Sequence, residues 1–322
     1  MRFILPFALS AAAVATPSGP ETIDLIRLTE ATRLAEAVRE RAWPGWGKTP
    51  SPVLLVGPAQ EFLVGFPRTP PGFTDAGYSS ILRAPIRTRP RQLQPDLLAT
   101  FPAFGPPSVI VVGRAEATKK NSTSWVLTIL HEHFHQYQNE APGYYAAVEG
   151  LGLSGGDQTG MWMLDYPFPY QDAKVAEQFA GVARLLGRAL EEPGDATRRE
   201  VWRAYADFLR GLSEKDRSYL SFQVWQEGVS RYVELRVAEI ASRDYEPSLE
   251  FRALPDAQPF AAVAGEMRAA ILRELASPDL PKRQRVSFYA FGAGLALLLD
   301  EDAPGWKSRY LNEKFFLETY RD

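Results

Sequence analysis

The sequence contains no cysteine and only three histidines among its 322 residues. Without cysteine the chain can form neither a disulfide framework nor a lipid attachment through a thiol. Long runs of basic residues are also missing, and 36 Lys+Arg against 39 Asp+Glu leave a net charge of -3. We therefore expect no nucleic-acid partner, because the electrostatic footprint of such a protein is absent.

The N-terminus combines a basic Arg2, a mostly apolar run from Phe3 to Val14, and the small residues Ala13-Val14-Ala15. This order is typical of a secretory signal peptide, since a bilayer span needs about 20 apolar residues. Proline and glycine between residues 17 and 20 would end a helix there. We predict a signal peptide over 1–15, export to the periplasm or the outside of the cell, and no integral membrane segment after its removal.

The rest of the chain is apolar enough, at 45% hydrophobic and 12% aromatic residues, to bury a large core. Short apolar runs predict strands at 52–57, 61–66 and 108–113, and the proline-rich stretch 67–107 predicts irregular structure with one or two short strands. Helical spacing then predominates, at 171–191, 197–212, 221–241, 258–276 and 286–300. We predict an α+β fold over residues 16–322, with a lobe containing a small mixed sheet at about 21–140 and a helical lobe at about 141–322.

All three histidines lie in the stretch "TILHEHFHQYQNE", residues 128–140. Apolar residues recur there at helical spacing, and Ser or Thr at 122–124 would cap the helix. On that helix His131 and His135 share one face, with Glu132 beside them, which is the H-E-x-x-H pattern of zinc hydrolases. The two imidazoles would bind one zinc ion per chain, and Glu132 would take a proton from the water that the ion activates.

The third histidine, His133, would lie on the opposite side of the helix, where we expect it to be packed or hydrogen-bonded. A β-strand would instead bring all three imidazoles to one face. The helical spacing of the neighbouring apolar residues disfavours that alternative.

A catalytic zinc needs a third protein ligand and an open position. Since no other histidine or cysteine exists, this ligand must be an aspartate or a glutamate. The extended metzincin pattern fails, because Gln138 and Ala141 stand where it requires Gly and His. Glu227, early in a predicted helix, is the best candidate, and Glu149, Glu177 and Glu234 remain alternatives.

Three segments resemble the gluzincin metallopeptidases, the thermolysin-like and aminopeptidase N-like families. Residues 128–137 look like their first zinc helix, and "EGVSRYVE" at 227–234 resembles the second helix of the aminopeptidase N-like group. In "SFYAFGAG", Tyr289 falls at the position of their oxyanion-stabilising tyrosine, although Phe291 replaces a lysine. The resemblance implies a zincin-like fold, with Glu227 as the third ligand. The long separation of His135 from Glu227 departs from those families.

These observations predict an exported zinc metallopeptidase that binds a peptide or protein substrate. His131, His135 and Glu227 would hold the metal, Glu132 would be the general base, and Tyr289 would stabilise the oxyanion. The strand at 108–113 would lie near the cleft, where a substrate could add as an extended chain. Two alternatives are a zinc hydrolase of a non-peptide amide or ester, and a non-catalytic metal-binding or scaffold protein.

Overall fold

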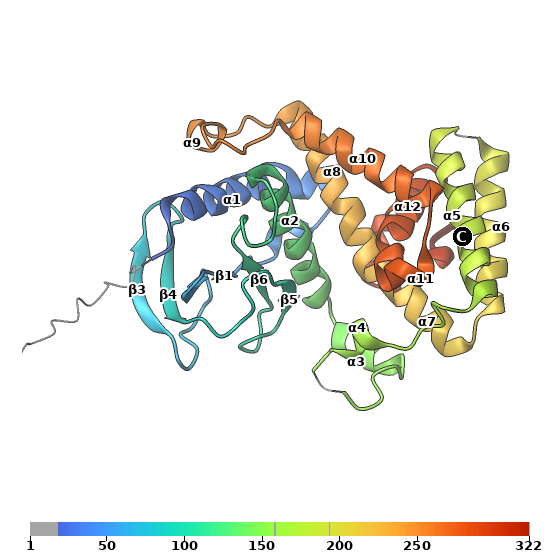
Figure 1. Ribbon diagram of the computed structural model, residues 1–322, viewed down its shortest axis with the longest axis horizontal. Coiled ribbons are helices and arrows are strands. Elements are labelled where there is room, and N and C mark those ends of the chain that lie inside the picture. Colours follow the sequence, from blue (N-terminus) through green and yellow to red (C-terminus); the bar gives the residue numbers. More distant parts are fainter. Residues whose placement is uncertain (1–18, 158, 193, 322) are drawn as a thin grey trace, which may run out of the picture.

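The computed structural model describes residues 19–157, 159–192 and 194–321. The predicted signal peptide lies outside the described residues, so export and the domain boundary near residue 15 stay predictions. Within the described part, a sheet occupies one side of the molecule and a mainly helical region the other (Figure 1). This arrangement confirms the predicted α+β fold class.

The six strands form one mixed sheet in the order β3-β4-β2-β1-β6-β5. β1 pairs antiparallel with β2 and parallel with β6, while β5 pairs antiparallel with β6 at the end of the sheet. The predicted strands correspond to β1, β2 and β6. The proline-rich stretch holds three strands rather than one or two, because β3 and β4 form an exposed hairpin with little apolar signal. The strand bounds are β1 Val53–Val56, β2 Gln60–Val64, β3 Thr74–Ser79, β4 Ala84–Pro90, β5 Leu98–Phe101 and β6 Val109–Gly113.

The two faces of the sheet are buried by different partners. Val53, Leu55, Ile110 and Val112 join the main core with helices α1 and α2, while the alternating residues of these strands join a second cluster with Phe66 and Phe73. Because both faces are covered, β1 and β6 are buried along their whole length. The two helices on the main-core side are α1 Thr22–Ala42 and α2 Ser122–Asn139.

The helical region follows the sheet and contains all the longer helices predicted from the sequence. Its principal helices are α5 Ala173–Glu191, α6 Asp195–Gly211, α7 Glu214–Gln223, α8 Val229–Asp244, α10 Phe260–Ala276 and α12 Ser287–Asp302. The short ones are α3 Tyr144–Gly150, α4 Trp162–Asp165, α9 Leu249–Arg252 and α11 Leu280–Arg283, and 3-10 turns occur at η1 Trp46–Lys48, η3 Gln284–Val286, η4 Trp306–Ser308 and η5 Leu317–Arg321. No helix among the described residues has both the length and the apolar character needed to cross a bilayer.

Helix α7 continues into α8 through a single π-helical turn, η2 (Val224–Gly228). α2 and α8 lie side by side between the sheet and the helical region (Figure 1). Turns of this type are rare and occur frequently at functional sites. The helix predicted at 221–241 is therefore part of one longer helical rod with a local change of winding at Glu227.

Two glycines allow α12 to approach this turn closely. A Cβ atom on Gly228 would lie 2.5 Å from the Cα of Gly292, and one on Gly292 would lie 2.7 Å from the Cα of Gly228. The obstructing atoms are backbone, so no side chain could move aside to make room. Glycine at both positions brings the first turns of α12 against the turn that carries Glu227.

We expect the substitution Gly228→Ala to lower the free energy of unfolding by about 1–3 kcal/mol, since it overpacks a backbone contact. Denaturant unfolding would measure the change. Gly265→Ala is the matched control, because this helical glycine has open space around its Cβ position. Alanine there should stabilise the protein by up to about 1 kcal/mol. Equal stability of the Gly228→Ala variant and the unsubstituted protein would contradict the close contact.

Candidate metal centre

The histidine-bearing face of α2 is buried although it is polar. His131, Glu132 and His135 are 8%, 6% and 6% exposed. The helix begins as expected, except that Asn121 is its cap: the Asn121 side chain accepts a hydrogen bond from the Ser124 N–H at 2.8 Å. Buried ionisable groups are costly unless they are paired or bind a metal. The partners of these side chains therefore decide whether the face is stabilised by internal pairing or is suited to bind a metal ion.

Three potential ligand atoms from two helices converge on one point. The Nε2 atoms of His131 and His135 are 3.2 Å apart. Glu227 Oε2, from the π-helical turn, lies 3.9 Å from the Nε2 of His131 and 3.5 Å from that of His135. Two ligands about 2.0–2.1 Å from one tetrahedral zinc would themselves be about 3.3 Å apart. The observed separations are close to that value.

The group His131, Glu132 and His135 could by itself hold a metal ion, since its ligand atoms all lie within 4.8 Å of one another. This result agrees with the H-E-x-x-H prediction from the sequence. It identifies a possible site for one metal ion, and it identifies neither the ion nor a reaction.

The charges around these atoms favour a positive charge at the centre. Burial alone would lower the pKa of His135, but the carboxylate of Glu227 offsets this effect and holds that pKa above its ordinary value. Burial would raise the pKa of Glu227, but the imidazoles of His135 and His131 hold it below its ordinary value. A proton on His135 thus separates two acceptor atoms that would otherwise repel each other. A divalent ion would satisfy the same atoms in its place.

Each imidazole is oriented by a second set of residues on its Nδ1 side. His135 Nδ1 is 2.6 Å from Gln138 Oε1 and 3.2 Å from the hydroxyl of Ser230. Because a carbonyl oxygen only accepts, Nδ1 carries a proton, and in the neutral ring Nε2 presents its lone pair to the centre. Such contacts fix the tautomer and the ring orientation of metal-binding histidines.

The other imidazole is backed by a charged pair. Glu234 Oε2 lies 3.6 Å from His131 Nδ1 and 2.7 Å from Arg231 Nη1. The guanidinium of Arg231 helps to hold the pKa of Glu234 below its ordinary value, against the effect of burial. Glu234 is therefore positioned behind the ring of His131, on the side away from Glu227.

Gln138 also joins α2 to the π-helical turn. Its Nε2 donates to the backbone carbonyl of Gln226 at 3.0 Å and to the hydroxyl of Tyr310 at 2.6 Å, which donates in turn to the carbonyl of Trp225 at 2.8 Å. The changed winding of a π turn leaves backbone carbonyls to be satisfied by side chains. One fully buried amide thus both orients His135 and fixes the turn that carries Glu227.

Glu132 faces the end of the sheet. The hydroxyl of Thr100 on β5 lies 2.8 Å from Glu132 Oε2 and 3.0 Å from the Glu132 backbone carbonyl. The prediction that strand 108–113 could receive an added chain is wrong, because β6 is paired on both sides, by β1 and β5. The strand at the end of the sheet is β5, and its Thr100 is in contact with Glu132.

Tyr289, on the first turn of α12, lies at the same centre. Its hydroxyl accepts a hydrogen bond from Arg285 Nη1 at 2.8 Å, and the carboxylate of Glu227 is near enough to influence its pKa. Burial and the carboxylate of Glu227 raise the pKa of Tyr289 well above its ordinary value, so the phenol keeps its proton. Arg285 and Thr100 belong to no recognisable sequence motif, and Ser230 lies in the segment "EGVSRYVE" without a role that the pattern alone reveals.

The third histidine and the alternative glutamates lie elsewhere. His133 contacts the carbonyl of Thr49 through Nε2 at 3.2 Å and lies beside the ring of Trp46, and burial lowers its pKa to about 4. It is a packed residue on the sheet side of α2. Glu149 and Glu177 are exposed and are absent from the group around the imidazoles.

Comparison with known proteins adds no family: no family model, no curated protein and no solved structure matches the chain. The likeness to gluzincins therefore rests on the three short segments of the sequence.

We expect zinc to bind the protein at one ion per chain and to raise its melting temperature. At free zinc 100-fold above Kd the stabilisation is about 2.7 kcal/mol. The variant His131→Ala should lose both the bound ion and the shift in melting temperature. The control is His133→Asn, which alters the histidine outside the group and should keep the metal. Retention of zinc by His131→Ala would contradict the site.

We expect Gln138→Leu to weaken zinc binding by about 10- to 100-fold, the usual effect of removing a residue that orients a ligand. Zinc titration against a competing chelator would measure this loss. Gln136→Leu is the matched control: Gln136 is also buried on α2 but donates to the carbonyls of Pro52 and Ser108. Both variants should be destabilised, and only Gln138→Leu should bind zinc more weakly. Equal affinities would show that the amide has no role at the centre.

Proposed function

We propose that the protein is an exported zinc-dependent metallopeptidase of gluzincin type. The observation that carries this proposal is the convergence of His131, His135 and Glu227 from two helices, with Glu132 on the same turn as His131. Three ligand atoms at these separations leave a tetrahedral ion one open position, as catalytic rather than structural zinc sites do.

His131, His135 and Glu227 would hold the zinc ion. When bound, the ion supplies a Lewis acid that polarises the substrate carbonyl and lowers the pKa of water. Glu234 and Gln138 keep the two imidazoles oriented toward it. Gln138 is hydrogen-bonded to His135 Nδ1, and the Glu234 carboxylate lies 3.6 Å from His131 Nδ1, so both partners leave Nε2 free to act as a ligand.

Glu132 is the residue in this chain that would move protons. It accepts a proton from water as the new C–O bond forms, and it delivers that proton to the leaving nitrogen as the C–N bond breaks. Thr100 holds one carboxylate oxygen of Glu132, so that the other oxygen is available to the water. Tyr289 keeps its proton and would donate a hydrogen bond to the oxyanion that develops on the carbonyl.

The strand next to Glu132 supports a peptide as the substrate. β5 is the last strand on its side of the sheet and has a single strand partner among the described residues, so its outer edge has backbone groups that an extended chain could pair with. Two alternatives, a hydrolase of a non-peptide amide or ester and a protein that binds metal without turnover, are distinguished from this proposal by the following experiment.

We expect Glu132→Gln to retain about one zinc per chain while hydrolysis of unstructured peptides falls by about 10²–10⁴-fold, the usual contribution of a general base. Metal analysis and mass spectrometry of a peptide digest would measure the two quantities. Glu149→Gln, which changes an exposed glutamate outside the centre, serves as control and should keep full activity.

Three other outcomes are decisive. Equal rates for Glu132→Gln and the unsubstituted protein would rule out Glu132 as the base. Cleavage of small amides or esters without peptide cleavage would favour the first alternative. Zinc binding without turnover of any of these substrates would favour a non-catalytic metal-binding protein.

A further inference from the structure

Arg285 stands out among the charged residues around the centre because it has no acidic partner. It lies in η3, directly before α12, and is half-buried. Its hydrogen bond goes from Nη1 to the hydroxyl of Tyr289, and within the described ranges it forms no ion pair with any carboxylate. A partly desolvated guanidinium with unused donors is suited to bind a planar anion in a bidentate manner.

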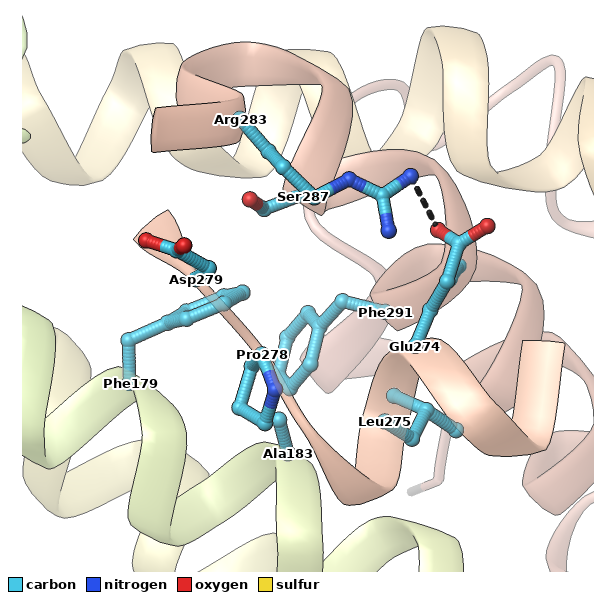
Figure 2. A pocket seen from close by; sticks show the side chains of 10 residues that line it. Phe179, Ala183, Glu274, Leu275, Pro278, Asp279, Arg283, Ser287 and Phe291 are labelled. Atoms are coloured by element: carbon cyan, nitrogen blue, oxygen red, sulfur yellow. Dashed lines mark ion pairs between the residues drawn. The ribbon is translucent and has the colours of Figure 1, made fainter. Parts of the chain in front are cut away.

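The neighbouring arginine, by contrast, is paired with a carboxylate. Arg283, two residues earlier, forms an ion pair with Glu274 at 2.7 Å, and Figure 2 shows its side chain reaching toward that carboxylate beside a small cavity. Between the two, Gln284 has a φ of +48°, a backbone conformation that side-chain-bearing residues rarely adopt. This strained residue lies between an arginine paired with Glu274 and one that contacts Tyr289.

Arg285 is close to the reacting atoms. Its guanidinium donates to the Tyr289 hydroxyl at 2.8 Å, and both side chains feel the charge of Glu227, whose Oε2 is 3.5 Å from His135 Nε2. One residue of an extended chain spans about 3.3–3.6 Å. A substrate carbonyl at the centre would therefore place a carboxylate within reach of Arg285 if that carboxylate were one or two residues away.

The charges favour an anionic substrate. A divalent ion would be balanced by Glu227 and Glu132, and the charge of Glu234 is already paired with Arg231. Arg285 would then leave the centre with one net positive charge. The phenols of Tyr170 and Tyr219, which feel the charge of Arg285, are neutral and do not compensate it.

We propose that Arg285 binds a substrate carboxylate located within two residues of the cleaved bond, on the leaving-group side. This inference rests on the proposed hydrolytic function. Two sources could provide the carboxylate: the C-terminus of a peptide, or an acidic side chain near the cleavage point. If Arg285 prefers the C-terminal carboxylate, the protein would remove one or two residues from the free C-terminus of a peptide.

The test compares peptides that differ only in this charge. Zinc-loaded full-length protein is given one peptide with a free C-terminal carboxylate and the same peptide as its C-terminal amide. A second pair of amidated peptides carries Glu or Gln two residues after the cleavage point. We expect kcat/KM to favour the charged member of one pair by about 10- to 100-fold, a range typical of a charge-assisted hydrogen bond. The pair that responds identifies the source.

Substitutions of Arg285 and of its neighbour Arg283 test whether the preference for charged peptides comes from Arg285. Arg285→Gln should reduce the ratio between charged and neutral peptides to about one, and Arg285→Lys should restore part of it. Arg283→Gln, which removes the neighbouring arginine, should keep the ratio of the unsubstituted protein. An equal fall for charged and neutral peptides in Arg285→Gln would overturn the proposal and show that Arg285 acts through Tyr289.

A binding measurement separates failure of this inference from failure of the proposed function. Zinc-loaded Glu132→Gln is titrated calorimetrically with the free-carboxylate peptide, its amide, and the Glu and Gln amides. If no peptide is cleaved but the charged peptides bind at least 10-fold more tightly, the carboxylate site stands and the hydrolytic function fails. If charged and neutral peptides bind equally, the carboxylate site fails whatever the activity.

Discussion

The buried side chain of Gln138 joins the two helices on which the site depends. Its oxygen orients His135, and its nitrogen bonds to the carbonyl of Gln226 in the π-helical turn. His131 and His135 are far from Glu227 in sequence, so the three side chains meet only if α2 and this turn keep a fixed register. The oxygen and the nitrogen of this one amide each make a hydrogen bond. A shift of either helix would therefore disturb both the orientation of the His135 ring and the support of the π-helical turn.

The convergence of three acceptor atoms has an electrostatic consequence for the folded protein. Two imidazole nitrogens and a carboxylate oxygen within 3.9 Å of one another are stabilised by positive charge between them. Without a metal, a proton on His135 supplies that charge, as its raised pKa indicates. The same proton would compete with a metal ion for the site, since ligands must be deprotonated to bind.

The parts of the structure that have strong local periodicity could be predicted from the sequence. The apolar runs of β1, β2 and β6 and the long helices are of this kind, as is the H-E-x-x-H turn, whose geometry follows from helical spacing alone. The β3–β4 hairpin was missed because exposed strands carry little apolar signal. The π-helical turn, the pairing of Thr100 with Glu132 and the free guanidinium of Arg285 depend on contacts between distant segments, which no local pattern encodes.

The long chain between His135 and Glu227 was the main departure from the zinc peptidases that the sequence resembles, and the fold shows how it is accommodated. This segment forms α3 to α7, and its last helix leads directly into the turn that carries Glu227. α5 and α7 pack on α12, and α12 reaches the turn through the contact of Gly292 with Gly228. Helices α5 and α7 therefore support the element that positions Tyr289 and Arg285. This segment is therefore part of the structure around the candidate metal centre, rather than an appendage to it.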